Sequence, residues 1–278
     1  MPLTPTGEIV RKAAETGRGV GAFNVIQLEH AEALVAGAEH AGAPVILQIS
    51  ENAVKYHRGL EPLALATLAV AREASVPVAV HLDHATDPEL VREAVTLGFG
   101  SVMFDASVLS YDDNVAATRE VAARCRARDV FVEAELGEVG GKDGVHAPGA
   151  RTDPDEAAAY VEATGVDALA IAVGTSHAML EKTASLDFDL ITAHRRVVPV
   201  PLVLHGSSGV PEADLTHAVE AGMTKVNIAT ALNQAFTAAV RDYLAANPSV
   251  VDTRKYLAPG RAAVAREVTR LLGVLKAT

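Results

Sequence analysis

The segment VPVAVHLDH (residues 76–84) begins as a continuous apolar, β-branched run and ends on His81, Asp83 and His84. An apolar run without polar alternation is typical of a strand that is buried on both faces, as in parallel sheets. The polar residues at its end either cap an ordinary strand or form part of a metal site. The other runs of the chain distinguish these two interpretations.

Seven further runs of this kind alternate with Ala- and Glu-rich stretches of helical character. They are GVGAFNV (19–25), PVILQIS (44–50), SVMFDAS (101–107), VFVEAELG (130–137), ALAIAVG (168–174), PLVLHGSS (201–208) and KVNIAT (225–230). Eight buried strands with intervening helices match a (β/α)8 barrel, whose usual length is about 250 residues. An open doubly wound sheet is the competing fold, but it favours a Gly-rich turn after the first strand, and the sequence contains no GxGxxG. We therefore predict an α/β fold, a (β/α)8 TIM barrel, with residues 1–278 forming one domain.

Composition and charge restrict the class of protein. Hydrophobic residues make up 49% of the chain and charged residues 21%, a balance typical of a globular protein. The formal net charge of −11 disfavours nucleic acid and anionic membranes as partners. The single cysteine, Cys125, excludes an intrachain disulfide and fits a reducing compartment. With no signal-peptide core and no apolar run near the ~18 residues of a membrane span, we expect a cytoplasmic protein that binds neither nucleic acid nor membrane.

Polar side chains stand at or just after the carboxyl end of nearly every run. They are Asn24, Ser50, Asp83, His84, Asp105, Ser107, Glu133, Glu135, His177, His205, Asn227 and Thr230. Any one of them is explained equally well as a capped or solvated strand end. In a barrel, however, these strand ends meet at one rim, and that rim is where active sites are built. The set as a whole therefore predicts a functional site.

Histidines end the third, sixth and seventh runs, at His84, His177 and His205. Neutral imidazoles from neighbouring strands can converge on one ion and leave a position open for substrate or water. A lone histidine is more often a hydrogen-bonded core residue, but three at neighbouring rim positions beside Asp83 favour zinc or another divalent ion. Histidines in the predicted helices and loops, His30 among them, are interpreted as surface or packing residues.

Two loops at the same rim are candidates for binding phosphate. HGSSGVPEAD (205–214) has small residues and a Pro-led helix start, and NIATALNQAF (227–236) runs directly into a helix. Loops after the seventh and eighth strands of a barrel commonly hold an anion on free backbone amides and helix N-termini. Either loop alone is weak support, and their shared position strengthens the prediction.

The chain resembles the class II (zinc-dependent) ketose-bisphosphate aldolases, closest to the tagatose-bisphosphate and fructose-bisphosphate types. The motifs that carry the resemblance span the whole length: GAFNV, PVILQIS, VPVAVHLDHATD, GFGSVMFDAS, VEAELGEVGG, AVGTSH, LVLHGSSGV, TKVNIAT and RKYLAP. The HLDH and GTSH…LHGSSG series is the most specific part. Membership implies the barrel fold predicted above and places the family's functional residues on this chain.

The resemblance implies a role for each residue of the rim. Zinc ligands fall on His84, His177 and His205, and the catalytic aspartate falls on Asp83. A second or alternative metal site falls on Asp105 and Glu135. The substrate and phosphate contacts implied are Asn24, Ser50, Gly174, Gly206, Ser207, Ser208, Asn227 and Thr230. Gly174 is also implied to neighbour a monovalent cation.

The activity implied is metal-dependent, reversible aldol cleavage of a ketose 1,6-bisphosphate, of tagatose or fructose type, to dihydroxyacetone phosphate and glyceraldehyde 3-phosphate. Zinc would act as a Lewis acid, although histidines alone do not exclude another divalent ion. Asp83 would exchange the proton of the C4 hydroxyl. A homo-oligomer, a dimer or a tetramer, is also implied. The alternatives are another phosphorylated keto substrate, such as a deoxy-keto-gluconate phosphate, and a non-catalytic aldolase-like partner subunit.

The chain departs from the family pattern in the loop after the fifth run. The family usually has a Glu-Asp pair after a double glycine there, whereas this chain reads GGKDG (140–144). We expect Asp143 to supply the second acid–base group, with a shorter side chain than the usual glutamate, and Glu138 is a weaker candidate. Ala106 and Ala178 also stand where the family usually has glycine.

Two other enzyme classes fit the residues less well. A Schiff-base aldolase needs a lysine at the carboxyl end of a strand, and Lys225 is expected at the start of its strand. Zinc hydrolases on this barrel begin with a His-x-His pair at the end of the first strand, where this chain has Phe23, Asn24 and Val25.

Asp83 and His84 are adjacent, and strand alternation sends adjacent side chains to opposite faces. Both can face one site only if the strand ends or twists between them. We therefore predict a local break in regular strand geometry at this point.

Overall fold

The structure, a computed structural model, describes residues 2–137, 151–176 and 179–278. Within these ranges eight parallel strands close into a barrel in sequence order, and β8 pairs with β1. The strands are β1 (Val20–Asn24), β2 (Val45–Ser50), β3 (Val78–Ala85), β4 (Ser101–Phe104), β5 (Phe131–Leu136), β6 (Ala168–Ile171), β7 (Leu202–Leu204) and β8 (Met223–Ile228). The predicted (β/α)8 TIM barrel is confirmed. Because β8 begins two residues before the apolar run, Lys225 lies inside the strand and not at its start.

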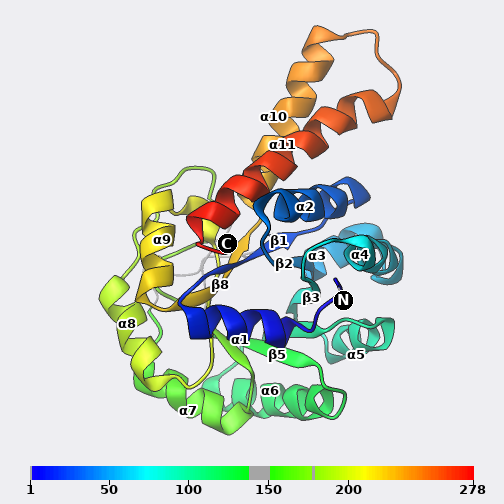
Figure 1. The fold of residues 1–278 in the computed structure, drawn as a ribbon. Coiled ribbons are helices and arrows are strands. Elements are labelled where there is room, and N and C mark those ends of the chain that lie inside the picture. Colours follow the sequence, from blue (N-terminus) through cyan, green and yellow to red (C-terminus); the bar gives the residue numbers. More distant parts are fainter. Residues whose placement is uncertain (1, 138–150, 177–178) are drawn as a thin grey trace.

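Helices surround the barrel as an outer ring (Figure 1). They are α1 (Thr6–Thr16), α2 (Leu28–Ala41), α3 (Glu51–His57), α4 (Glu61–Glu73), α5 (Pro88–Leu97), α6 (Tyr111–Arg126), α7 (Pro154–Thr164), α8 (Phe188–Val197), α9 (Glu212–Ala221), α10 (Thr230–Ala246) and α11 (Thr253–Val274), with a short 3₁₀ turn, η1 (Ser207–Gly209). The paired α10 and α11 extend away from the barrel, which distinguishes them from the other helices.

Local sequence signals explain where the helices begin and end. The Asp87 side chain accepts a hydrogen bond from the Glu89 backbone N–H at 2.8 Å, and Pro88 occupies the first turn of α5, where its missing N–H costs nothing. Gly98 ends this helix with φ +96°, a conformation that glycine adopts without strain. α7 begins in the same way, with Asp153 capping a helix that starts at Pro154.

The core has two layers, one between strands and helices and one inside the barrel. Ile9, Val10 and Ala13 of α1 belong to the inner layer together with strand residues such as Ile46 and Val203. α1 therefore packs across the amino-terminal end of the barrel, where Figure 1 shows it in front of the strands. With that end closed, the carboxyl-terminal rim is the end at which the barrel interior can meet a substrate.

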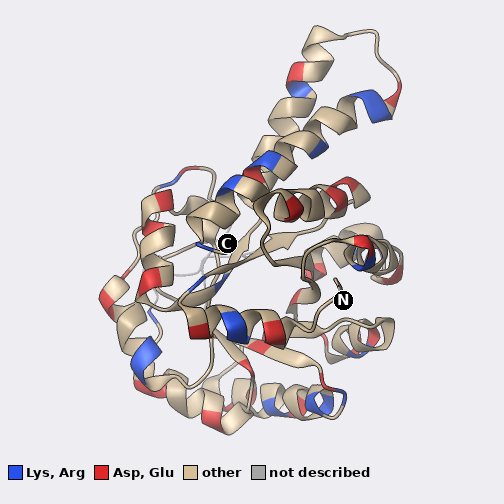
Figure 2. Cartoon of the chain, viewed as in Figure 1, with Lys and Arg blue, Asp and Glu red and all other residues tan. Residues whose placement is uncertain are grey.

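Charged residues lie mainly on the outer helices, and most helices carry both signs (Figure 2). Glu133 and Lys225 are exceptions, because both are fully buried inside the barrel. Among the described helices, none combines the length and apolar character that crossing a bilayer would require.

Candidate active site

Strand β3 delivers two consecutive side chains to the same place. His84 has φ +51°, a left-handed conformation that is uncommon for residues other than glycine. The pairing of β3 with β4 shifts register between Leu82 and Ala85, so regular alternation is interrupted at Asp83 and His84. The predicted break in strand geometry is confirmed. Strained backbone of this kind persists where surrounding structure enforces it, and it is frequent at functional sites.

Two histidines converge at the rim from β3 and from the residue after β7. The Nε2 atom of His84 lies 2.8 Å from Nδ1 of His205, and their rings are nearly perpendicular, with an interplanar angle of 80°. Candidate ligand atoms of these two residues and of Asp83 all lie within 4.8 Å of one another. The two imidazole nitrogens suit a divalent ion, and the Asp83 carboxylate lies close beside them.

The second ring nitrogen of each histidine contacts a carboxylate. His84 Nδ1 lies 2.8 Å from Oδ2 of Asp105, and His205 Nε2 lies 3.0 Å from Oε1 of Glu133. An ionised carboxylate can only accept, so the ring nitrogen facing it carries the proton. The nitrogens facing each other then both present lone pairs, which repel at this distance unless a cation lies between them. The residues present therefore fit a bound metal ion, with the carboxylates acting as the outer partners that metal-binding histidines usually have.

Asp105 and Glu135 also meet the site. With His84 they form a second group whose candidate ligand atoms lie within 4.8 Å. Ser107 Oγ donates to Oδ1 of Asp105 at 2.6 Å, which fixes this carboxylate against His84. Glu135 Oε2 lies 3.8 Å from His205 Nδ1. The second metal site on these residues stays a prediction.

Asp83 is buried beside the two histidines. Asn227 Nδ2 donates to its Oδ1 at 3.3 Å, and the same oxygen lies 3.9 Å from His84 Nε2. Burial raises the pKa of this carboxyl, but His84, His205 and the buried Lys225 lower it, and the net pKa lies below its ordinary value. The carboxylate is therefore ionised at neutral pH and able to accept a proton.

Asn24 and Ser50 both lie at the rim and are tied to their surroundings. The Oδ1 atom of Asn24 accepts from Gln48 Nε2 at 2.6 Å, and Ser50 caps α3 by accepting from the Ala53 backbone N–H at 3.3 Å. Ser50 pairs in register with Asp83, so it lies next to the candidate catalytic carboxylate. Gln48 escaped the sequence analysis because it stands two residues before the end of its strand.

The loops after β7 and β8 meet as predicted for a phosphate site. Ser208 Oγ accepts from the backbone N–H of Ala231 at 3.2 Å, which joins the first loop to the start of α10 at Thr230. Ser207 Oγ donates inward to the Leu204 carbonyl at 3.1 Å, whereas the buried Oδ1 of Asn227 has no hydrogen-bond partner in the described part of the chain.

Two glycines at this edge cannot carry a side chain without strain. Gly206 has φ +67°, and a Cβ there would lie 2.6 Å from the Ser176 carbonyl oxygen. Gly174 has φ +116°, and its Cβ would lie 2.2 Å from the carbonyl oxygen of Ser185. Glycine is therefore required at both positions by close backbone approach.

Some predicted site residues cannot be placed. His177 and Asp143 lie outside the described residues, as does Ala178. Ala106 lies within them and is buried. The metal role of His177 and the acid–base role of Asp143 stay predictions.

Beneath the rim lies a buried polar layer of His81, Glu133 and Lys225. Glu133 belongs to the predicted set of strand-end residues, whereas Lys225 was expected at the start of its strand. Lys225 Nζ lies 2.8 Å from Oε2 of Glu133, and His81 Nε2 lies 3.9 Å from the same oxygen. The signal was present as a spacing of two, because Lys225 precedes Asn227 and Glu133 precedes Glu135 by two residues. In a strand that spacing keeps both side chains on one face.

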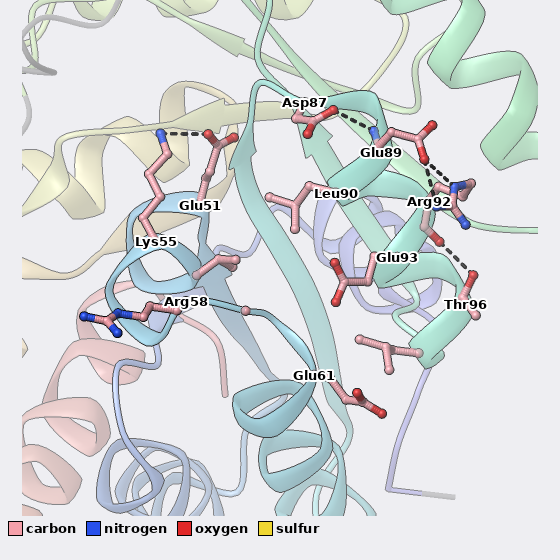
Figure 3. Close-up of a pocket in the computed structure, with 13 residues that line it drawn as sticks. Glu51, Lys55, Arg58, Glu61, Asp87, Glu89, Leu90, Arg92, Glu93 and Thr96 are labelled. Atoms are coloured by element: carbon pink, nitrogen blue, oxygen red, sulfur yellow. Dashed lines mark hydrogen bonds and ion pairs between the residues drawn. The ribbon is translucent and has the colours of Figure 1, made fainter.

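A separate surface groove of about 620 Å³ lies outside the rim, between α3 and α5 (Figure 3). Its lining includes Glu51 and Lys55, whose ion pair measures 2.8 Å, but not Asp83, His84 or His205. Glu51 also accepts from the Thr86 backbone N–H at 2.6 Å. The groove is thus distinct from the candidate active site, and Glu51 anchors the backbone two residues after His84.

Comparison with known proteins agrees with this geometry. The family model described as "Fructose-bisphosphate aldolase class-II" matches residues 4–278. A fructose-bisphosphate aldolase of Thermus caldophilus is 41% identical, with 95% of this chain and 94% of the relative covered. A probable fructose-bisphosphate aldolase of Bacillus subtilis (strain 168) is 40% identical, with 96% and 95% covered.

Solved structures give the same result. The YdjI aldolase of Escherichia coli K12 superposes with a TM-score of 0.85 at 31% identity, covering 99% of this chain and 98% of that one. A putative fructose-1,6-biphosphate aldolase of Coccidioides immitis superposes with a TM-score of 0.88 at 30% identity, covering 99% and 96%. The structural likeness therefore extends over almost the whole chain.

Proposed function

The chain belongs to the class II fructose-bisphosphate aldolase family, and we propose that it catalyses metal-dependent, reversible cleavage of a ketose 1,6-bisphosphate to dihydroxyacetone phosphate and glyceraldehyde 3-phosphate. The observation that carries this proposal is the convergence of His84 Nε2 and His205 Nδ1 beside the Asp83 carboxylate. The names of the relatives support fructose 1,6-bisphosphate as the first substrate to test. Tagatose 1,6-bisphosphate differs only in the configuration of one hydroxyl and is the second.

His84 and His205, with His177, would hold the metal ion, and zinc is the ion we propose. Facing nitrogen lone pairs 2.8 Å apart support a cation at this point. When bound, the ion would supply Lewis acidity, polarising the ketose carbonyl and stabilising the negative charge that develops during cleavage. Asp105 and Glu133 would keep the two ring nitrogens aimed at it.

Asp83 acts as the general base in cleavage. Its carboxylate takes the proton from the C4 hydroxyl while the C3–C4 bond breaks, and in condensation it returns that proton. The hydrogen bond from Asn227 Nδ2 holds Oδ1 in place, and the lowered pKa keeps the group ionised before the reaction. The electron pair of the broken bond stays with the dihydroxyacetone phosphate fragment, whose C3 must gain a proton. We assign that second proton transfer to Asp143.

The phosphate of the dihydroxyacetone fragment would bind where the loops after β7 and β8 meet. Gly206, Ser207 and Ser208 bring backbone amides and a hydroxyl to this point, and Asn227 of β8 and Thr230 at the start of α10 flank it. Free amides and a helix N-terminus favour an anion. Gly174 borders the same edge, where we propose a monovalent cation, and Asn24 and Ser50 would line the sugar-binding side.

We also propose that the chain forms a homo-oligomer, a dimer or a tetramer. The pair α10 and α11 projects from the barrel (Figure 1) and exposes Val251 to 89% and Leu244 to 38% near its far end. Sedimentation equilibrium of the full chain measures the state directly. A monomer at all concentrations would contradict this part of the proposal.

The substrate is tested by incubating zinc-loaded protein with a panel of phosphorylated ketoses and measuring release of dihydroxyacetone phosphate with a coupled reductase. The panel contains fructose and tagatose 1,6-bisphosphates and a deoxy-keto-gluconate phosphate, and His84→Ala is the inactive control. We expect the wild-type protein, but not His84→Ala, to cleave a ketose bisphosphate. The proposal would be overturned if the zinc-loaded wild-type protein cleaved only the deoxy-keto-gluconate phosphate, or cleaved no member of the panel.

A further inference from the structure

A row of polar side chains leads through the barrel interior to the candidate metal ligand His205, with one step of 3.9 Å that is not a hydrogen bond. Thr6 of α1 is hydrogen-bonded through its hydroxyl to Ser101 at 2.6 Å, and Ser101 Oγ lies 2.8 Å from His81 Nδ1. The opposite ring nitrogen of His81 faces Glu133 at 3.9 Å, and Glu133 contacts His205 at 3.0 Å. These polar side chains thus lie between α1, which closes one end of the barrel, and the candidate site at the other end.

Glu133 contacts two different partners through its two carboxylate oxygens. One carboxylate oxygen, Oε1, faces Nε2 of His205, and the other, Oε2, lies 2.8 Å from Nζ of Lys225. Both partners of the ion pair are entirely buried, and so is His205. Within the described chain, then, the charge that balances Glu133 at close range is that of Lys225.

An isolated carboxylate in the dry interior of a barrel is costly, whereas a paired one is tolerated. If Lys225 were removed, Oε2 of Glu133 would lose the ammonium group that lies 2.8 Å away and holds the carboxylate in position. Glu133 would then no longer present a fixed acceptor to His205. The ring of His205 would then lose the carboxylate acceptor that binds its Nε2–H and orients its Nδ1 toward the metal position.

We propose that Lys225 is a positioning residue for the metal site, which acts on His205 through the buried carboxylate of Glu133. The inference rests on the proposed function, because it requires His205 to bind the ion. It assigns a role to a lysine that is fully buried within β8, two residues before Asn227. Outer partners of metal-binding histidines commonly change metal affinity by 10–100-fold when they are lost.

The test separates positioning from stability by removing the charges singly and together. Lys225→Met leaves a buried carboxylate unpaired, and we expect a lower melting temperature and weaker zinc binding. The double variant E133Q/K225M leaves no uncompensated charge, so its metal-free melting temperature should return toward that of the wild type. Its glutamine is a weaker, neutral acceptor for His205, so zinc affinity should remain 10–100-fold below that of the wild type.

Zinc dissociation constants are measured by competition with a chromophoric chelator, and melting temperatures are measured on the metal-free proteins. Lys276→Met, which breaks the exposed ion pair with Glu220, is the matched control and should leave the affinity of the protein for zinc unchanged. A folded Lys225→Met variant, or a folded double variant, that binds zinc within twofold of the wild type would overturn the inference. If the wild-type protein bound no zinc, the proposed metal site would be wrong, and so would this inference.

Discussion

Nε2 of His84 and Nδ1 of His205 lie 2.8 Å apart although the residues are separated by 121 positions in the chain. The barrel brings them together because both stand at carboxyl ends of strands, and the break in β3 turns His84 toward the same point as Asp83. The carboxylates of Asp105 and Glu133 fix the outer nitrogens, so the inner pair is oriented in advance of any ligand.

Asp83→Asn should abolish most of the activity while leaving the metal site in place. An amide keeps the shape of the side chain and can still contact Asn227, but it cannot take the C4 hydroxyl proton. We expect kcat to fall by about 10²- to 10⁴-fold, the range typical of general-base removal. Steady-state cleavage of the preferred ketose bisphosphate measures this, with zinc content determined on the same samples. A variant that keeps a tenth of the wild-type kcat would exclude Asp83 as the base.

Asp105→Asn should weaken metal binding more than it weakens folding. The hydrogen bond of 2.8 Å to His84 Nδ1 would lose its charge, so the ring would be held less firmly. We expect zinc affinity to fall by about 10-fold or more, as for other outer partners of metal-binding histidines. Chelator competition measures the affinity, and the exposed Asp112→Asn on α6 is the control. Equal affinities of the two variants would show that Asp105 does not orient His84.

Gly206→Ala should damage both the fold and phosphate binding. Its φ of +67° disfavours any side chain, and the added Cβ would lie 2.6 Å from the Ser176 carbonyl oxygen. We expect a loss of about 1–3 kcal/mol in the free energy of unfolding, together with a raised KM for the bisphosphate substrate. Denaturant titration and initial-rate kinetics measure the two effects.

The control for this glycine is Gly273→Ala, at a helical position with nothing within 4 Å of the added Cβ. Alanine there should leave KM unchanged and raise stability slightly, because it favours helix over glycine. The prediction for Gly206 would be wrong if both variants had the stability and KM of the wild type.

His30 should make the protein less stable as the pH falls. Its burial against Phe236 lowers the pKa to about 4, so the folded state keeps the ring neutral where the unfolded state, with a pKa near 6.5, takes up a proton. Stability is therefore unaffected above pH 6.5 and is lost progressively as the pH falls from 6.5 to 4. The loss attributable to this residue is on the order of 3 kcal/mol at the acid end.

His30→Phe tests this sign, since phenylalanine fills a similar space and does not titrate. Urea unfolding between pH 4 and 7.5 should give a shallower pH dependence for the variant than for the wild type. The two proteins should differ in slope mainly below pH 6.5. Parallel curves over the whole range would show that His30 titrates alike in the folded and unfolded states.

Apolar runs were sufficient to predict the barrel, because strands buried on both faces need no polar alternation and each of the eight runs overlaps an observed strand. The break between Asp83 and His84 was also predictable, since two adjacent ligands cannot face one site on a regular strand. Glu133 was among the predicted strand-end residues, but its pairing with Lys225 was not predicted, because it joins positions 92 residues apart on strands whose relative depth a single sequence does not give. The start of β8 was placed two residues late, and this error put Lys225 at the wrong end of the barrel.

Metal-dependent cleavage is tested by release of dihydroxyacetone phosphate from fructose or tagatose 1,6-bisphosphate by the wild-type protein before chelation, after chelation and after zinc is restored. We expect activity to disappear with the metal and to return on addition of one equivalent of zinc per chain. Undiminished release by protein that elemental analysis shows to be free of metal would contradict this expectation.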